Sequence, residues 1–500
     1  MIANSTSHKG DDTFFGVSPV TGEQLEPAFV DATLSEIDSA MTHAEAAFWN
    51  YRKVPGDVRA NFLEAIADAL TDATDTIVAR AILETGLPEG RLRGEMGRTT
   101  GQLRMFAKLL HDHTWQGIHI DHELPERTPL PRPDLRRMLI PVGPVVVFAA
   151  SNFPLAFSVA GGDTASALAA GCPVVVKAHP AHPGTSELVG AEIVHAAKDS
   201  GMPEGVFSLL HGRNHEVGLA LVRHPHTTAV GFTGSLKAGR ALFDAAVQRP
   251  VPIPVYAEMG STNPLFILPK ALEESSDSIA AGLAQSVTIG AGQFCTNPGL
   301  VIAEDGAPLE HFVQTLARHI EETSPAPMLY EGIHQAFNAA VKSTSDTGGV
   351  RLAGQATSDG GLKASPAVLH TDAKTFLANP QLAEEIFGPA TLVVASNLEE
   401  MLELAKNLQG QLTATIHGED AELLSHSDLI DVLETKAGRL IFNGFPTGVE
   451  VCAAMNHGGP YPATTDVRTT SVGTTAIERF LRPICYQNFP RHALPEPLRD

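Results

Sequence analysis

Short, wholly apolar segments alternate with longer amphipathic ones between residues 142 and 258, and this alternation most constrains the fold. The apolar segments include "VGPVVVFAA" (142–150) and "CPVVVKA" (172–178), and "GVFSLLHG", "TTAVGFTG" and "PIPVYAEMG" continue the series. Between them, 156–171 and 185–201 have the spacing of helices. Continuous Val/Ile/Leu strands separated by helices predict a parallel sheet that is covered on both faces.

A second series of the same kind begins at "NPLFILP" (263–269) and runs through "PATLVVA" (389–395) to "RLIFNGF" (439–445). We therefore expect an α/β protein with two doubly wound parallel-sheet lobes. Residues 114–140 differ, because they are rich in proline and alternate imperfectly. That pattern is typical of exposed, twisted strands.

Composition excludes several classes of protein. A net charge of −22 over 500 residues disfavours nucleic acid or anionic lipid as a partner. No apolar run approaches the ~20 residues that span a bilayer. The polar N-terminus has no signal-peptide pattern, which predicts a cytoplasmic protein.

One cysteine stands in a small and polar setting, "GAGQFCTNPG" (290–299), which is unlike that of a buried structural thiol. Cys295 is therefore a candidate nucleophile. Cys172 opens an apolar strand and is expected in the core, while Cys452 and Cys485 lack polar companions and receive no catalytic role. The histidines of "HDHTWQGIHIDH" (111–122) have no completing carboxylate or cysteine, so no metal site is predicted.

Other segments place polar groups at the ends of strands, where open α/β sheets bind ligands. Each has an ordinary structural alternative, such as a helix cap, a turn or a solvated strand end. In "GFTGSLKAG", free amides at a helix start would suit a phosphate. The candidates are Asn152, Lys177, Gly234, Ser235, Gly239, Glu258 and the glutamate of "EIFGP", Glu385.

Together, the cysteine motif, "EIFGP", "GFTGS" and Asn-Phe-Pro resemble the aldehyde dehydrogenase superfamily over residues 10 to 490. The resemblance implies that Cys295 attacks an aldehyde and that Asn152 and the Cys295 N–H hold the oxyanion. Glu258 would be the general base, giving a free acid as product. Glu385 and Phe387 would contact the nicotinamide ribose and ring, Lys177 the adenosine ribose, and Ser235 the pyrophosphate.

"EMGSTNP", "GQFCTNPGL", "KAHPAHPGTSE", "HGGPYPATTD" and "RPICYQNFP" further resemble bacterial 2,5-dioxovalerate (α-ketoglutaric semialdehyde) dehydrogenases. A fatty aldehyde dehydrogenase of luminous bacteria shares much of this pattern and remains the alternative. A keto-acid aldehyde needs a cation, and Arg98 and Arg104 of one helix are candidates, although both can equally be surface charges. Phe153, Phe157 and Phe294 can line either kind of pocket.

The position three residues after Lys177, often glutamate in relatives that prefer NAD, is Pro180. With no acidic residue there, and with Arg213 as a candidate partner of a 2′-phosphate, we expect NADP, with NAD as the alternative. Arg213 can also be an ordinary loop charge.

The resemblance also implies a cofactor-binding domain (1–114 and 141–258), a catalytic domain (259–445) and an oligomerisation element (115–140 and 466–500). The element predicts a homodimer or homotetramer. A non-catalytic binding protein of the same fold is disfavoured, because both Cys295 and Glu258 are present.

Overall fold

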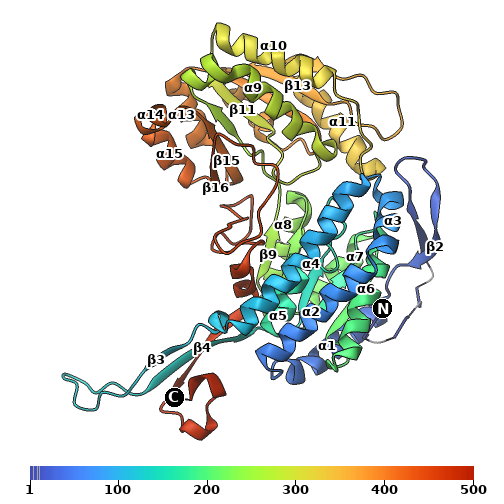
Figure 1. The fold of residues 1–500 in the computed structure, drawn as a ribbon, viewed down its shortest axis with the longest axis vertical. Helices are drawn as coiled ribbons and strands as arrows, with labels where there is room; N and C mark the ends of the chain where they lie inside the picture. Colours follow the sequence, from blue (N-terminus) through green and yellow to red (C-terminus); the bar gives the residue numbers. More distant parts are fainter. Residues whose placement is uncertain (4, 8, 11, 500) are drawn as a thin grey trace.

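The computed structural model describes residues 1–3, 5–7, 9–10 and 12–499. It shows two α/β lobes, one above the other in Figure 1, with an antiparallel arm projecting below. Both the doubly wound α/β class and the two-lobe division predicted from the alternation of segments are confirmed. None of the helices in the described ranges is long and apolar enough to cross a membrane.

The first lobe contains a parallel five-stranded sheet in the order β7-β6-β5-β8-β9. Its strands are β5 (Val145–Phe148), β6 (Val174–Lys177), β7 (Phe207–Leu210), β8 (Ala229–Thr233) and β9 (Val255–Glu258). Its helices are α1 (Leu34–Tyr51), α2 (Gly56–Asp72), α3 (Thr74–Thr85), α4 (Glu89–His111), α5 (Gly162–Ala170), α6 (Pro183–Asp199), α7 (His215–Arg223) and α8 (Leu236–Val247). A hairpin of β1 (Thr13–Val17) and β2 (Gln24–Val30) precedes them.

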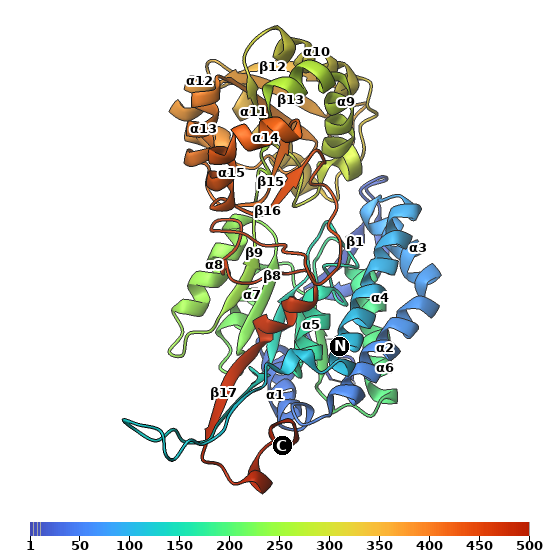
Figure 2. The same cartoon turned by 60° about the vertical axis from the view of Figure 1, so that its left-hand side comes forward.

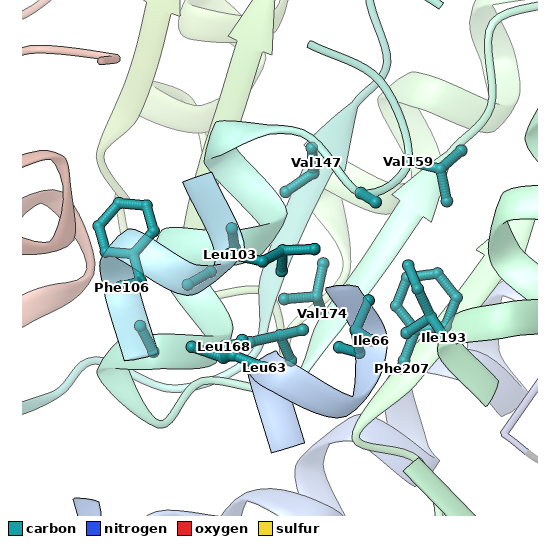
Figure 3. Close-up of a cluster of buried hydrophobic side chains, with 14 of the residues drawn as sticks. Leu63, Ile66, Leu103, Phe106, Val147, Val159, Leu168, Val174, Ile193 and Phe207 are labelled. Carbon is teal, nitrogen blue, oxygen red and sulfur yellow. The ribbon is translucent and has the colours of Figure 1, made fainter. Parts of the chain in front are cut away.

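Successive side chains of each strand face opposite sides of this sheet, and both sides are buried. Val145 and Val147 belong to a cluster with α2, α4, α5 and α6, whereas Val146 and Phe148 belong to one with α1, α7 and α8. Figure 3 shows part of the first cluster, to which Leu63 of α2 and Leu168 of α5 both belong. Burial on both faces explains why these strands have no polar alternation.

The helix expected over 156–171 is shorter than predicted, because α5 begins only at Gly162. Residues 151–161 form an irregular loop. The N–H groups of Leu155 and Ala156 donate to the buried Glu95 carboxylate at 2.8 and 3.0 Å instead of to helix carbonyls. A side chain from α4 thus satisfies this backbone, and the loop that carries Asn152 is fixed in place.

The second lobe contains a seven-stranded sheet in the order β12-β13-β14-β11-β10-β15-β16. All neighbours are parallel except β12, an antiparallel edge strand. The strands are β10 (Leu265–Ile267), β11 (Leu300–Glu304), β12 (Arg351–Gln355), β13 (Ala367–Asp372), β14 (Ala390–Ser396), β15 (Gln411–His417) and β16 (Ala437–Phe442). The helices are α9 (Pro269–Thr288), α10 (Ala307–Glu321), α11 (Glu331–Ser345), α12 (Ala373–Ala378), α13 (Leu398–Asn407), α14 (Asp420–Ser425) and α15 (Ser427–Glu434).

The arm is a three-stranded antiparallel sheet of β3 (His119–Asp121), β4 (Leu135–Pro141) and β17 (Leu481–Gln487). Figure 2 shows β17 beside the teal segment that carries β4. Short 3-10 helices complete the chain: η1 (Thr114–Gln116), η2 (Ile289–Gly292), η3 (Pro380–Ala383), η4 (Thr474–Phe480), η5 (Arg491–Ala493) and η6 (Glu496–Leu498). Residues 115–140 therefore do form strands with the C-terminal region, while the oligomeric role of the arm and the three domain limits stay predictions.

After β16 the chain returns to the first lobe through residues 443–473, which we call the return segment (Figure 2). It runs against β9, since Met259 N–H donates to Ala463 and Thr465 N–H donates to Ala257. The return segment therefore brings its side chains to the carboxyl end of β9, where Glu258 is located.

Candidate active site

Three reactive side chains from three parts of the chain meet between the lobes. Cys295 follows η2 in the second lobe, Glu258 ends β9 in the first, and His457 belongs to the return segment. The Nε2 atom of His457 lies 3.4 Å from the Cys295 Sγ and 2.9 Å from Glu258 Oε1. One imidazole nitrogen thus bridges the thiol and the carboxylate.

Glu258 is buried, with 4% of its surface exposed, and each of its carboxylate oxygens accepts a hydrogen bond. The Ser471 hydroxyl donates to Oε2 at 2.8 Å, and His457 contacts Oε1. Burial alone would raise the pKa of Glu258, but His457 and Ser471 outweigh it and the pKa lies below its usual value. The geometry therefore favours an ionised carboxylate in this position.

The pKa of the Cys295 thiol is raised well above its usual value, first by burial and then by the negative charge of Glu258. The resting thiol is consequently protonated at neutral pH. Two groups lie within reach of its proton: His457 Nε2, and the Glu258 carboxylate, which hydrogen-bonds the thiol. Either can accept the proton when an electrophile arrives and a thiolate forms.

A buried polar network holds the loop that carries the thiol. The Asn263 amide, at φ 47°, donates to the carbonyl oxygens of Cys295 and Asn297 at 2.8 and 2.9 Å. Ser261 and Thr413 hydroxyls donate to the Asn263 Oδ1, each at 3.0 Å. The "GSTNP" segment thus fixes the position of the backbone that carries the nucleophile.

The cysteine loop is also pressed against the "EIFGP" loop. Gly292 has φ 64°, and a Cβ there would lie 2.3 Å from the carbonyl carbon of Gly388. The Asn297 amide donates to the Gly388 carbonyl at 3.1 Å. Only glycine allows this approach, which couples the positions of the two loops.

Asn152 lies in the irregular loop after β5, with its amide beside the cysteine loop. Its Nδ2 donates to the Gln293 carbonyl at 3.0 Å. An amide NH₂ carries two hydrogens, so one remains to meet an oxyanion. Its position is consistent with donation to the oxyanion, and this role of Asn152 stays a prediction.

Aromatic rings and the side chains of Arg91 and Arg98 surround the approach to Cys295. Phe153 makes edge contacts with Phe157 and Phe294 at centroid distances of 5.3 and 5.2 Å. The Arg98 guanidinium lies 5.1 Å from the Phe157 ring. Within the described residues, the buried Nε and Nη2 atoms of Arg98 have no hydrogen-bond partner. Burial lowers the pKa of Arg98, and the nearby Cys295 and Glu95 side chains oppose this.

Arg104 is not part of this group. The sequence allowed it to be either an anchor for the substrate carboxylate or a surface charge, and the structure agrees with the surface charge. Six residues after Arg98 on α4, it points to another side of the helix. Its Nη2 binds Asp68 of α2 at 2.8 Å, and 47% of its side chain is exposed. Arg104 is a surface charge.

The predicted cofactor residues lie along the carboxyl edge of the first sheet and across from it. Lys177 ends β6, and Gly234 follows β8 and donates its N–H to the Glu258 carbonyl at 3.0 Å. Ser235 is the N-cap of α8, with its hydroxyl accepting from the Ala238 N–H. Gly239 lets α8 pack on Met259, because a Cβ would lie 2.7 Å from that side chain.

On the side of the second lobe, Glu385 and Phe387 line a hollow together with Ser261 and Thr262. The Glu385 Oε2 lies 2.7 Å from where a Gly260 Cβ would be. Burial raises the pKa of Glu385 to about 7, although the Ser261 N–H opposes this. A carboxylate thus reaches across from "EIFGP" to the end of β9.

Arg213 follows β7 and already forms an ion pair with Asp31, whose Oδ2 accepts from both Nε and Nη2 of the guanidinium. Nothing in the sequence pattern singled out Asp31, His457, Ser471 or Asn263. His457 opens "HGGPYPATTD", a segment quoted above only for its resemblance, and its distance along the chain from Cys295 hides their contact.

The other three cysteines lie outside this site. Cys172 is buried, as its apolar strand predicts, whereas Cys452 and Cys485 are exposed.

Across the described ranges, the group of side chains that could hold a metal ion is Glu258, Cys295 and His457. Their donor atoms lie within 4.8 Å of one another. These are the reactive side chains themselves, so the group is best described as a nucleophile with its proton acceptors.

A half-buried cysteine beside a buried glutamate, at the carboxyl edge of a doubly wound parallel sheet, is the arrangement of an enzyme with a cysteine nucleophile. The chain belongs to the aldehyde dehydrogenase family, whose sequence model matches residues 6–480. It is therefore an oxidoreductase of a family that uses NAD(P).

Two relatives match nearly the whole chain. Alpha-ketoglutaric semialdehyde dehydrogenase 2 of Azospirillum brasilense is 51% identical, covering 98% of this chain and 94% of its own. Alpha-ketoglutaric semialdehyde dehydrogenase of Acinetobacter baylyi is 47% identical, covering 94% and 90%. In fold, a Pseudomonas syringae aldehyde dehydrogenase mutant solved with NAD⁺ and octanal is similar with a TM-score of 0.83, 22% identity and coverage of 98% and 96%.

Proposed function

We propose that this enzyme oxidises α-ketoglutaric semialdehyde (2,5-dioxovalerate) to 2-oxoglutarate. Both near-full-length relatives carry the name of that activity. The observation that carries the proposal is Arg98, whose buried Nε and Nη2 lack a partner among the described residues next to the reactive thiol. An unpaired buried guanidinium is costly unless a ligand anion meets it. The distal carboxylate of the substrate is such an anion.

The protein's own groups suffice for the covalent steps. Cys295 passes its proton through His457 towards Glu258 while its sulfur bonds to the aldehyde carbon, forming a thiohemiacetal. Asn152 Nδ2 and the Cys295 N–H donate to its oxygen. A bound NAD(P) would supply the hydride acceptor, and the acyl group would then remain on Cys295 as a thioester. Once Glu258 has released the first proton to solvent, it takes a proton from water as the water oxygen adds to the thioester carbon. Collapse of this adduct breaks the C–S bond, and the proton held by Glu258 returns to the sulfur, which releases the acid and restores the thiol.

The residues present fit an NAD(P) cofactor. Ser235 caps α8 at the carboxyl edge of the sheet, where free amides favour a pyrophosphate. Lys177 stands at the adjacent strand end for the adenosine ribose, and Glu385 lies opposite for the nicotinamide ribose. The preference for NADP over NAD stays a prediction, with Arg213 as the proposed partner of the 2′-phosphate.

The fatty aldehyde alternative is not favoured. An apolar tunnel would leave the Arg98 guanidinium without an anion near the thiol.

We also propose that the projecting arm joins copies of the chain into a homodimer or homotetramer, because β3 and β17 are its edge strands.

The test compares specificity constants for 2,5-dioxovalerate and a long-chain aldehyde, with the Cys295→Ala variant as blank. We expect the dioxo acid to be preferred. Arg98→Gln should raise its KM by about a hundredfold, as for loss of one charge-assisted hydrogen-bonding partner. Arg104→Gln, on the same helix, is the matched control and should leave KM unchanged. A preference for the long-chain aldehyde, or equal effects of both variants, would reject the assignment.

A further inference from the structure

A carboxylate from the N-terminal part of the chain lies among the residues proposed to hold the adenosine end of the cofactor. Asp31 follows β2 directly. Its Oδ1 accepts from the Arg213 backbone N–H at 2.8 Å, and its Oδ2 accepts from Nε and Nη2 at 3.1 and 2.8 Å. The Arg213 guanidinium also lies 5.0 Å from the Phe14 ring. Asp31 therefore fixes both the backbone and the side chain of Arg213.

This ion pair is located at the carboxyl edge of the sheet. Lys177 ends β6 and pairs with Leu210, the last residue of β7, and Arg213 comes three residues later. The Ala32 N–H donates to the His211 carbonyl at 3.0 Å, which holds the Asp31 segment against the same edge. Burial lowers the pKa of Lys177 to about 8, and the charge of Asp31 opposes that effect. Asp31 thus acts on both cations.

Exposure differs between the two partners. The Arg213 side chain is 43% exposed, so a phosphate can reach it, whereas that of Asp31 is only 10% exposed and is held by the fold. In dinucleotide-binding sheets an acidic side chain at the adenosine ribose suits NAD, and an arginine accommodates the 2′-phosphate of NADP. Here both kinds of residue are present and bind each other.

We propose that Asp31 sets the cofactor preference by occupying the Arg213 guanidinium, so that the 2′-phosphate of NADP meets a cation that is already paired. This rests on the proposed function, since it assumes that the adenosine ribose lies at Lys177. Asp31 is a positioning residue that acts through Arg213. The ion pair with Asp31 weakens the attraction of Arg213 for the 2′-phosphate, so that the affinity for NADP exceeds that for NAD by less and the enzyme can still bind NAD.

The experiment measures the Kd of NAD and of NADP by calorimetry in the Cys295→Ala background, where turnover does not interfere. Asp31→Asn keeps the acceptor for the Arg213 N–H and removes the charge. The ratio Kd(NAD)/Kd(NADP) should rise about tenfold, because the guanidinium released from Asp31 can then form a charge-assisted hydrogen bond with the 2′-phosphate. Adding Arg213→Gln should abolish the effect of Asp31→Asn on that ratio. Glu310→Gln, which breaks the exposed Arg351 ion pair in the other lobe, is the control.

An unchanged ratio, or a shift towards NAD, overturns the inference, because Asp31 would then be neutral or would hold Arg213 ready for the phosphate. An effect that persists with Arg213→Gln overturns the route through Arg213. If no variant binds either cofactor, the inference and the proposed function fall together. If both cofactors bind but the wild-type enzyme does not oxidise 2,5-dioxovalerate, only the proposed substrate is rejected.

Discussion

At the scale of single residues, Glu258 has two opposite effects on the ionisation of Cys295. Through His457 it can accept the thiol proton, which promotes attack on the aldehyde. Through its charge it raises the pKa of the thiol, which disfavours a free thiolate. The resting enzyme is thereby protected from chance electrophiles, while a bound aldehyde still finds a proton acceptor in place.

Replacing Glu258 by glutamine separates these two effects. We expect alkylation of wild-type Cys295 by iodoacetamide to be slow at pH 8 and to keep rising with pH, since its pKa is raised. In Glu258→Gln the charge is gone, so alkylation at pH 8 should be about tenfold faster, while aldehyde turnover is lost. Peptide mass spectrometry measures the rate for Cys295, with exposed Cys452 and Cys485 as internal references. Slower alkylation of the variant would show that Glu258 acts mainly as the base for the thiol.

At the scale of elements, the chemistry depends on two loops from the second lobe being pressed together. The contact of Gly292 with Gly388 leaves no room for a side chain, and the bond from Asn297 to the Gly388 carbonyl closes it. The thiol of the first loop and Glu385 of the second therefore keep a fixed relation. A change that separates Gly292 from Gly388 therefore moves both the Cys295 thiol and Glu385, the residue proposed to contact the cofactor.

Gly292→Ala should accordingly abolish activity and lower the unfolding midpoint well beyond the effect of backbone strain alone. Gly22→Ala is the matched control, because Gly22 has φ 75° but no atom within 4 Å of a Cβ. The control should lose only about 1 kcal/mol of stability, the cost of a left-handed alanine, and keep its activity. Equal losses in the two variants would mean that the loop contact is loose.

The sequence allowed the elements to be predicted better than the site. Wholly apolar strands and strand-end glycines are local signals, and they place Glu258 at the end of a strand and Asn152 just after one, as the structure has them. Asp31, Asn263 and His457 carry no such signal, since each acts only through a contact that the fold creates. The start of α5 was predicted too early for a related reason: Glu95, far along the chain, satisfies the N–H groups that a helix would otherwise bond.

At the scale of the whole molecule, the arm is the part that the two lobes do not cover (Figure 1). The connection between β3 and β4 carries Leu130, which is 70% exposed. A large exposed apolar side chain on a projecting sheet suits a contact with another copy.

We expect light scattering to give a dimer or tetramer for the wild-type protein, and Leu130→Lys to shift it towards smaller species. Leu424→Lys is the control, because Leu424 is 81% exposed but lies on α14 in the second lobe. A wild-type monomer, or the same shift in both variants, would argue against assembly through the arm.

The return segment has a consequence for how the enzyme is made. The cysteine leaves the ribosome long before His457 and Ser471, which reach Glu258 only after the chain has come back from the second lobe. Until then a nascent chain holds a thiol and a carboxylate but not the histidine that joins them. Catalytic competence therefore arises at the end of synthesis, when the last crossing between the lobes is in place.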